Sequence, residues 1–511
     1  MTALQPLPMG AAASLLTTID GAARRGSGGA VTVDVPAAQL EAAVHHLAAA
    51  GARLADLFAA DGGQVTVRLV WGLDTERQYL VTETAIHAPE YPPLSDIAPA
   101  AFTEECEIYE QFGVRPAGGK PLNRVVLPPH AGKDFPRLGH RPPQAPAEVH
   151  ARHTVGGQAF EFPFGPVRQA AMESLYYGLV TSGEELVDLY LFTWHKHRGL
   201  EWRLRGRRPA EAMFLAERTE GLSATAVAWA LAAAVESALG AEPPPGALLT
   251  RGIALELERL YNHAAAVAAL CQAAGLSVGQ AAAEIALERL LRVNAATFGH
   301  RYLFGVLDAG GVRRAPDQAA LRDGLPGAYG ELRRAADALL GTNSFMDRLE
   351  ATGIVTTEQA RRLGLVGPVA RAAGVPIDCR LDQPTAPYSA HPPALAVRDA
   401  GDVLARFRVM LDEAADSVRL IGDLLAAGPG AGLTALPAGG GSGLGWAESA
   451  RGEALAWVSL DAGGRITRAR LRPASVRNWR GFDDAARSQN VFTDVPIIEA
   501  SFWLTVAGTA R

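Results

Sequence analysis

The chain has 511 residues, of which 48% are hydrophobic and 20% are charged, and its formal net charge is −6. This length predicts roughly two to four domains with buried cores, and the mildly acidic balance argues against a nucleic-acid binder. Three cysteines over this length do not make a disulfide framework, which favours a reducing compartment.

No membrane-spanning or secretory segment is expected. Residues 1–29 lack a basic start followed by an apolar core. No run reaches the ~20 apolar residues of a spanning helix. The stretch over residues 224–239 comes closest, but it contains Glu236 and is typical of a buried helix. If a membrane matters, we expect partner subunits to hold the protein there.

The first third of the chain mixes helix and strand patterns. Residues 1–30 are rich in Gly and Ala and are expected to be a flexible terminus. A helix is expected over residues 37–57, where apolar residues recur at helical spacing. Strands are expected over residues 65–73 and 79–84, joined by a turn.

A motif follows these strands. Residues 101–114 read AFTEECEIYEQFGV, and residues 121–127 read PLNRVVL. This pattern resembles the signature of the 30 kDa subunit of respiratory complex I, in which the segment scaffolds and carries no catalysis. The periodicity predicts a helix ending at Gly113. Its acidic side is expected to face solvent or a partner and comprises Glu104, Glu105, Glu107 and Glu110.

Residues 128–149 are rich in Pro, Gly and His and are typical of a linker, so we place a domain boundary at residue 148. Beyond it, hairpins are expected over residues 175–193 and 454–471. A Gly-rich stretch, residues 428–445, is expected to be a flexible insertion. Helices are expected over residues 224–239, 248–275, 277–297, 332–340 and 401–426.

Two distant segments carry the strongest functional signal. Residues 214–223 read FLAERTEGLS, and residues 498–511 read IEASFWLTVAGTAR. They resemble the metal-binding segments of the large subunit of membrane-bound nickel-iron hydrogenases, which read ERxCGxC and DPCxxCxxR. Further ordered motifs of that family and of the complex I 49 kDa subunit are matched by WHKHRGLE at 194–201, ELERLYNH at 256–263 and ESARGE at 448–453.

The resemblance is greatest to the fused large subunit of formate hydrogenlyase and hydrogenase-4 complexes. It implies an α+β fold: an N-terminal α/β domain like the 30 kDa subunit over residues 31–148, then a mainly helical domain with small β-sheets over residues 149–511. The second domain resembles both the 49 kDa subunit and the hydrogenase large subunit.

The resemblance also shows a specific departure. The four cysteine positions of the family hold Glu220, Ser223, Thr505 and Gly508. Nickel and its neighbouring iron are soft centres that thiolates hold, whereas these residues offer hard oxygen or no side chain. We therefore predict that this chain holds no nickel-iron centre and no other metal.

Four residues are candidates for a cavity or proton relay: Glu220, Glu173, Arg218 and His197. For Glu220 the alternative is a salt bridge that fills a vacated metal cavity. Glu173 matches a glutamate of energy-converting hydrogenases that is a candidate proton carrier, and Arg218 is expected to partner Glu220. His197 either lies on an exposed basic stretch or has a buried role at a subunit interface.

Two further alternatives remain open in this region. Glu256, Arg259 and His263 share one helix face and form either a satisfied buried network or a proton-transfer path. The places of the complex I quinone-binding His and Tyr hold Met172 and Pro209, which argues against the usual quinone ligands.

The resemblance implies a subunit of a membrane-associated oxidoreductase complex on the cytoplasmic side of the cell membrane. Its partners would be a small iron-sulfur subunit, which would carry the cluster, and membrane proton-pump or antiporter-like subunits. A quinone or another acceptor could bind here. No GxGxxG follows a strand, so any NAD site would belong to another subunit. The alternative is a non-catalytic subunit with a structural or coupling role.

Overall fold

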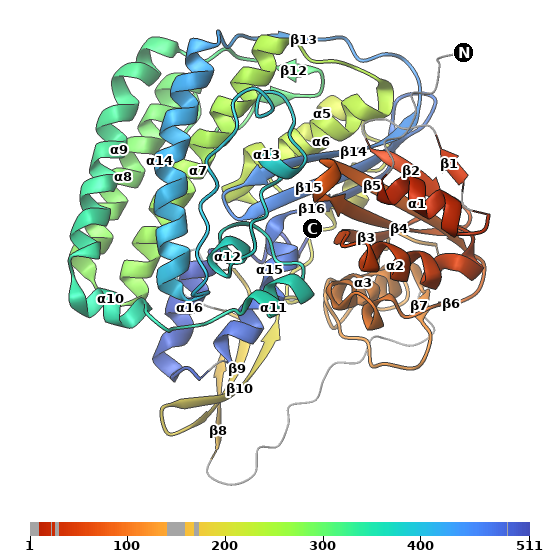
Figure 1. The fold of residues 1–511 in the computed structure, drawn as a ribbon, viewed down its shortest axis with the longest axis horizontal. Coiled ribbons are helices and arrows are strands. Elements are labelled where there is room, and N and C mark those ends of the chain that lie inside the picture. Colours follow the sequence, from red (N-terminus) through yellow and green to blue (C-terminus); the bar gives the residue numbers. More distant parts are fainter. Residues whose placement is uncertain (1–9, 22, 26–29, 141–158, 168–172, 488) are drawn as a thin grey trace. The chain divides into compact units, whose positions relative to one another are not determined.

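The computed structural model describes residues 10–21, 23–25, 30–140, 159–167, 173–487 and 489–511. The chain forms two compact units, residues 1–151 and 152–511. The boundary expected at residue 148, Met172, and residues 1–9, 22 and 26–29 of the expected flexible terminus lie outside the described residues. The described part of that terminus includes a helix over residues 11–18 and a short strand over residues 23–25. The α+β class, with a smaller mixed unit before a largely helical one, is confirmed (Figure 1).

The first unit is built on a five-stranded sheet of order β1-β2-β5-β4-β3, in which β2 and β5 run parallel and the other neighbours antiparallel. A two-stranded parallel sheet of β6 and β7 accompanies it. The elements are α1 (Ala11–Thr18), β1 (Ala23–Arg25), β2 (Val31–Asp34), α2 (Leu40–Ala49), β3 (Arg53–Asp61), β4 (Val65–Leu73), β5 (Gln78–Ile86), β6 (Glu90–Tyr91), α3 (Phe102–Phe112) and β7 (Arg115–Pro116).

The single helix expected over residues 37–57 is wrong. The α-helix α2 ends at Ala49, and Gly51 follows with a left-handed φ of 79°, which glycine adopts without a Cβ clash. The chain then pairs as β3 with β4, with Leu54 opposite Trp71. Pairing with β4 therefore places residues 53–57 in a strand, although their apolar spacing also fitted a helix.

The acidic side of α3 was expected to face solvent or a partner, and this is wrong. Glu104, Glu105, Glu107 and Glu110 are all buried. Glu105 accepts hydrogen bonds from the backbone N–H of Leu94 at 2.8 Å and of Ser95 at 3.3 Å. The Glu105 carboxylate therefore holds a neighbouring loop, a contact that periodicity within one helix does not reveal.

Glu110 holds the loop that follows α3. Its Oε2 accepts from the N–H groups of Val125, Val126 and Leu127 at 3.0–3.4 Å. Burial raises the pKa of the Glu110 carboxyl to about 7, even though the three N–H groups favour its charged form. The helix itself ends as expected, at Gly113 in the left-handed region.

The second unit is organised around long helices that lie side by side in Figure 1: α7 (Pro245–Ala273), α8 (Ser277–Phe298), α9 (Gln318–Leu340) and α14 (Val403–Ala426). The expected helices are present, and α9 begins well before residue 332. Shorter helices complete the body: α4 (Leu200–Leu204), α5 (Pro209–Ala216), α6 (Ala224–Leu239), α10 (Asn343–Leu349), α11 (Thr357–Arg362), α12 (Gly367–Ala372), α13 (Cys379–Asp382), α15 (Ala474–Ala486) and α16 (Val495–Phe502).

Three small sheets complete this unit. The expected hairpins form as β9 with β10 and as β15 with β16. The strands are β8 (Phe160–Phe164), β9 (Tyr176–Ser182) and β10 (Glu185–Phe192); β11 (Leu307–Asp308), β12 (Gly311–Val312) and β13 (Gly432–Leu433); and β14 (Gly441–Ser449), β15 (Gly452–Leu460) and β16 (Ile466–Arg472).

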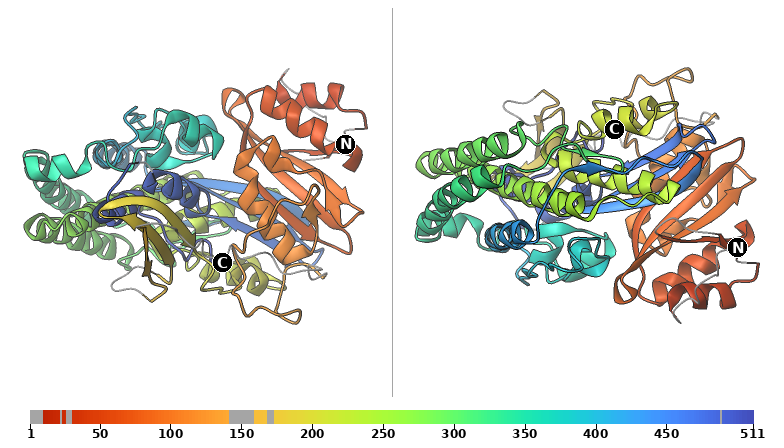
Figure 2. Two further views of the ribbon diagram at one scale, coloured as in Figure 1. Left: turned by 90° about the horizontal axis from the view of Figure 1, so that it is seen from below. Right: turned by 90° about the horizontal axis from the view of Figure 1, so that it is seen from above.

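The Gly-rich stretch expected to be a flexible insertion instead continues into β14, which packs on α6 (Figure 2). Gly441, Gly443 and Gly445 are alternate residues of the strand, so a Cβ added to any of them would project from the same face, the one toward α6. A Cβ on Gly441 would lie 2.5 Å from the Ala238 carbonyl oxygen, and the other two would meet α6 backbone more closely still. The glycines therefore let a strand and a helix touch backbone to backbone.

One helical stretch among the described residues, 221–239, is long and apolar enough to span a membrane, with a mean hydropathy of 1.5. Of this stretch, 72% is buried inside the protein. It is the packed helix α6, as the sequence predicted.

Candidate functional site

The two segments singled out in the sequence meet in the second unit. Glu220 lies just before α6, and Thr505 follows α16. The Thr505 hydroxyl donates to Glu220 Oε1 at 2.6 Å, and the Gly508 N–H donates to Thr505 Oγ1 at 3.2 Å. Residues almost three hundred positions apart thus form one cluster.

Two residues outside these segments complete the cluster. The Ser475 hydroxyl, at the start of α15, donates to Glu220 Oε1 at 2.5 Å. Arg451 Nη1 lies 3.3 Å from the same carboxylate oxygen and donates to Ser223 Oγ at 2.6 Å. Glu220 and Arg451 have exposed fractions of only 1% and 2%. The cluster is therefore a buried ion pair surrounded by hydroxyl groups.

Arg451 also ties the second segment to α7. Its Nε donates to the carbonyl oxygen of Trp503, and its Nη2 donates to Asn262 Oδ1 at 3.2 Å. The Trp503 indole N–H donates to the same amide oxygen at 3.2 Å. One guanidinium thus connects both segments and a core helix.

The donor set does not fit a nickel-iron centre. Glu220 Oε1 is taken up by two hydroxyl donors and a guanidinium, and Arg451 places a fixed positive charge where a metal cation would have to lie. Across the described residues, no group of three or more His, Cys, Asp or Glu side chains is arranged to hold a metal ion. The three cysteines are buried, form no disulfide with one another and lie in α3, α7 and α13.

A cavity of about 530 Å³ lies against this cluster. Thr505 belongs to both, and Glu173 stands in the cavity wall. Glu173 accepts a hydrogen bond from the Ala507 N–H, and Lys196 Nζ lies 3.7 Å from it. The wall is largely aromatic and aliphatic and is formed by Glu173, Gly221, Leu222, Ala269, Gln272, Tyr302, Phe304, Trp479, Glu499, Trp503, Leu504, Thr505, Val506 and Ala507.

Arg198 braces the loops behind the cavity. Its guanidinium donates to the carbonyl oxygens of Arg218, Thr219 and Ala507, the last at 2.6 Å. Burial lowers the pKa of the Arg198 guanidinium. The negative charges of Glu173 and Glu220 act in the opposite direction and favour its charged form. His197 beside it is half-buried and does not line the cavity.

The expected pairing of Arg218 with Glu220 is wrong. Arg218 lies 3.3 Å from Glu217 and stacks on the Phe214 ring at 3.6 Å and on the Phe304 ring at 4.7 Å. Its Nη1 also donates to the Phe214 carbonyl oxygen at 2.8 Å, so these contacts occupy its guanidinium. Arg451 takes the place beside Glu220, and it comes from the ESARGE motif that the sequence had flagged only as a family match.

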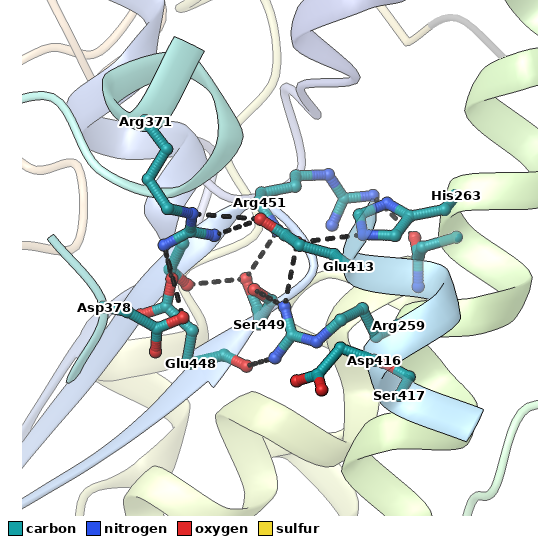
Figure 3. Close-up of polar contacts among 12 residues, drawn as sticks. Arg259, His263, Arg371, Asp378, Glu413, Asp416, Ser417, Glu448, Ser449 and Arg451 are labelled. Carbon is teal, nitrogen blue, oxygen red and sulfur yellow. Dashed lines mark hydrogen bonds and ion pairs between the residues drawn. The ribbon is translucent and has the colours of Figure 1, made fainter. Parts of the chain in front are cut away.

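Beside the cluster lies a buried network of charged residues (Figure 3). Glu413 accepts from Arg371 at 2.7 Å and lies 3.0 Å from His263 Nε2. Arg371 also contacts Glu448 at 2.9 Å, and Arg259 Nη1 donates to the carbonyl oxygen of Ser449 at 3.0 Å. The network therefore reaches Ser449 at the end of β14, two residues before Arg451 in the turn that leads to β15.

The helix-face stripe of Glu256, Arg259 and His263 belongs to this network. Arg259 Nε donates to Glu256 at 3.1 Å, and Arg380 donates to the same carboxylate at 3.0 Å. Burial disfavours the charged Glu256 carboxyl, but Arg380 and Arg259 outweigh it and hold its pKa at about 2. Burial lowers the pKa of His263, which favours a neutral imidazole beside Glu413.

These features define a class of protein: a smaller α/β unit is followed by a largely helical unit, in which two distant segments meet at a buried cluster beside a cavity. Three family models match the chain, one in the first unit and two in the second. The 30 kDa subunit of respiratory-chain NADH dehydrogenase matches residues 33–141, nickel-dependent hydrogenase matches residues 198–271, and the 49 kDa subunit of respiratory-chain NADH dehydrogenase matches residues 284–438.

Individual relatives agree. The chain is 28% identical to formate hydrogenlyase subunit 5 of Escherichia coli, over 82% of this chain and 76% of that one. It is 30% identical to the carbon monoxide-induced hydrogenase of Rhodospirillum rubrum, over 54% of this chain and 78% of that one. It is similar in fold to a chain of the archaeal membrane-bound sulfane sulfur reductase, a respiratory membrane complex, with a TM-score of 0.65, 24% identity and coverage of 69% of this chain and 99% of that one.

The chain belongs to the family that unites hydrogenase large subunits with the 49 kDa subunit of complex I, here fused to a 30 kDa-like domain. Its relatives include subunits of membrane-bound hydrogenases and of NADH-quinone oxidoreductases.

Proposed function

We propose that this chain is a subunit of a membrane-associated, complex I-like or hydrogenase-4-like oxidoreductase complex and works without a nickel-iron centre of its own. The observation that carries the proposal is the Glu220 carboxylate, held by Arg451, Ser475 and Thr505 where the family resemblance places thiolate ligands. Hard oxygen donors already engaged with one another are poor ligands for nickel.

The cavity supports a role in handling an electron acceptor. Tyr302, Phe304, Trp479 and Trp503 contribute aromatic walls, which suit a flat, largely apolar molecule such as a quinone. Electrons would come from an iron-sulfur cluster in a small partner subunit, and membrane proton-pump-like subunits would complete the complex. Two carboxyl groups, those of Glu173 and Glu499, line the described cavity wall, and Glu173 is the candidate to exchange protons with a bound ligand because its side chain is 24% exposed whereas Glu499 is buried.

A second candidate function is a non-catalytic subunit with a structural or coupling role. The saturation of Glu220 favours it, because a carboxylate fixed by three partners and 1% exposed is poorly placed to exchange protons. In this case the fold is retained to hold partner subunits together or to transmit conformational change.

Two measurements on the purified complex test these proposals. Metal analysis is expected to find no nickel, and stoichiometric nickel bound to this subunit would overturn the first proposal. Turnover is then compared for Glu173→Gln and Glu220→Gln, with Glu211→Gln on the surface as a matched control. A catalytic cavity predicts a loss of about 10²-fold or more for Glu173→Gln with assembly intact. Unchanged turnover in both variants removes these carboxylates from the mechanism and favours the structural role.

A further inference from the structure

A basic and aromatic surface lies on the two short helices α4 and α5, the second of which runs into the first segment. Between residues 194 and 211 the sequence carries six Lys or Arg residues and two Glu residues, in a chain whose net charge is −6. We define the α4–α5 patch by its exposed members, which are Trp202, Arg203, Arg207, Arg208 and Phe214, together with Arg465.

The patch combines large apolar rings with cations. The exposed fractions of Trp202 and Phe214 are 47% and 59%, which is unusual for such large side chains. Arg465, from the turn between β15 and β16, donates to the carbonyl oxygen of Gly206 at 2.8 Å. A second part of the fold therefore adds its guanidinium to the same surface.

The neighbouring carboxylates leave much of this charge uncompensated. Glu201 is buried and is held by Arg468 at 2.8 Å and Arg511 at 2.9 Å. Glu211 lies 4.0 Å from Arg207, and both side chains are more than half exposed. Within the part of the chain that the structure describes, Arg203 and Arg208 form no ion pair.

We propose that the α4–α5 patch binds the anionic phospholipid headgroups of a membrane surface. Guanidinium groups match phosphate oxygens with paired hydrogen bonds. An indole ring favours the layer between headgroups and acyl chains, where its apolar face is buried and its N–H stays hydrated, and a phenyl ring can insert beside it on the acyl-chain side. An acidic protein segment would match the charge but would leave the exposed rings of Trp202 and Phe214 in water.

This contact adds to attachment through partner subunits and gives the chain a preferred orientation. Each arginine near an anionic surface contributes additively, and the attraction acts within a Debye length, about 8–10 Å at physiological salt. The acidic remainder of the chain would be repelled by the same surface.

Co-sedimentation of the full-length chain with lipid vesicles tests the proposal. Binding to vesicles containing phosphatidylglycerol is expected, with much weaker binding to phosphatidylcholine alone, and binding should fall as salt is raised. The triple variant Arg203→Glu, Arg207→Glu, Arg208→Glu should lower partitioning to the anionic vesicles by about 100-fold. Trp202→Ala should weaken it further without changing the salt dependence.

The matched control is Arg322→Glu, Arg333→Glu, Arg334→Glu, which makes the same charge change on three exposed arginines of α9. Retained vesicle binding in this control supports the proposal, and an equal loss shows that net charge alone decides. Equal binding to neutral vesicles overturns it. Tight binding of poly-glutamate, with no binding to anionic vesicles, would instead assign the patch to an acidic protein partner.

Discussion

Removal of Arg451 is the perturbation that most directly probes the cluster between the two segments. Arg451→Met keeps much of the side-chain volume but deletes the contacts to Glu220, Ser223, Asn262 and the Trp503 carbonyl oxygen. It leaves the Glu220 carboxylate buried without a cation. Breaking a buried ion pair in this way costs about 3–5 kcal/mol. For a unit of this size, that lowers Tm by roughly 4–7 °C.

A double-mutant cycle separates the ion pair from simple loss of packing. Glu220→Met leaves Arg451 buried without its carboxylate, and the double variant removes both charges together. Because a buried pair replaced by apolar side chains is nearly neutral, the double variant should be more stable than the sum of the single effects predicts, by about 2–4 kcal/mol. Thermal and denaturant unfolding measure this coupling.

The surface pair of Arg398 and Asp412, which lie 2.5 Å apart, serves as the control for the cycle. Their side chains are 39% and 46% exposed, so the coupling between them should stay below about 1 kcal/mol. If the coupling energy between Arg451 and Glu220 were as small as that of this surface pair, the effects of the two single variants would simply add. That result would refute the view that one ion pair joins the two segments.

Two further predictions concern the packing of each unit. Gly445→Ala should destabilise the second unit by at least about 2 kcal/mol, because the added Cβ would meet the α6 backbone at Ala230. The control is Gly422→Ala on α14, where nothing lies within 4 Å of the added Cβ, and it should be neutral or stabilising by up to about 1 kcal/mol. Denaturant unfolding measures both effects. Because the folded pKa of Glu110 is raised to about 7, the folded state binds the extra proton and stability falls as pH rises from the unfolded pKa through 7. Glu110→Gln should remove a dependence of up to about 3 kcal/mol, measured by unfolding titrations across that pH range, and an unchanged pH profile would contradict this role.

The Glu220–Arg451 cluster links the two segments that resemble the metal-binding segments of the family. In such a site the metal holds two distant segments together, and binding free energy of that kind contributes to folding. Here Arg451 and Glu220 join the same two segments through charge-assisted hydrogen bonds, and Ser475 adds a third element. These side-chain contacts therefore hold the two segments together beside the cavity.

The sequence alone determined the class of fold, the order of its two parts and the helices α6, α7, α8 and α14, because long apolar periods and local capping signals act within a single element. It also indicated which two segments would matter, since both carry ordered family motifs.

The tertiary structure decided what lay around those segments. Arg451 rather than Arg218 faces Glu220, the glutamates of α3 turn inward to hold backbone N–H groups, and Gly441–Ser449 becomes a strand pressed against a helix. Each of these outcomes depends on residues far apart in the chain. Local spacing carries no information about which distant backbone or charge will arrive opposite a given side chain, so only the folded chain could settle them.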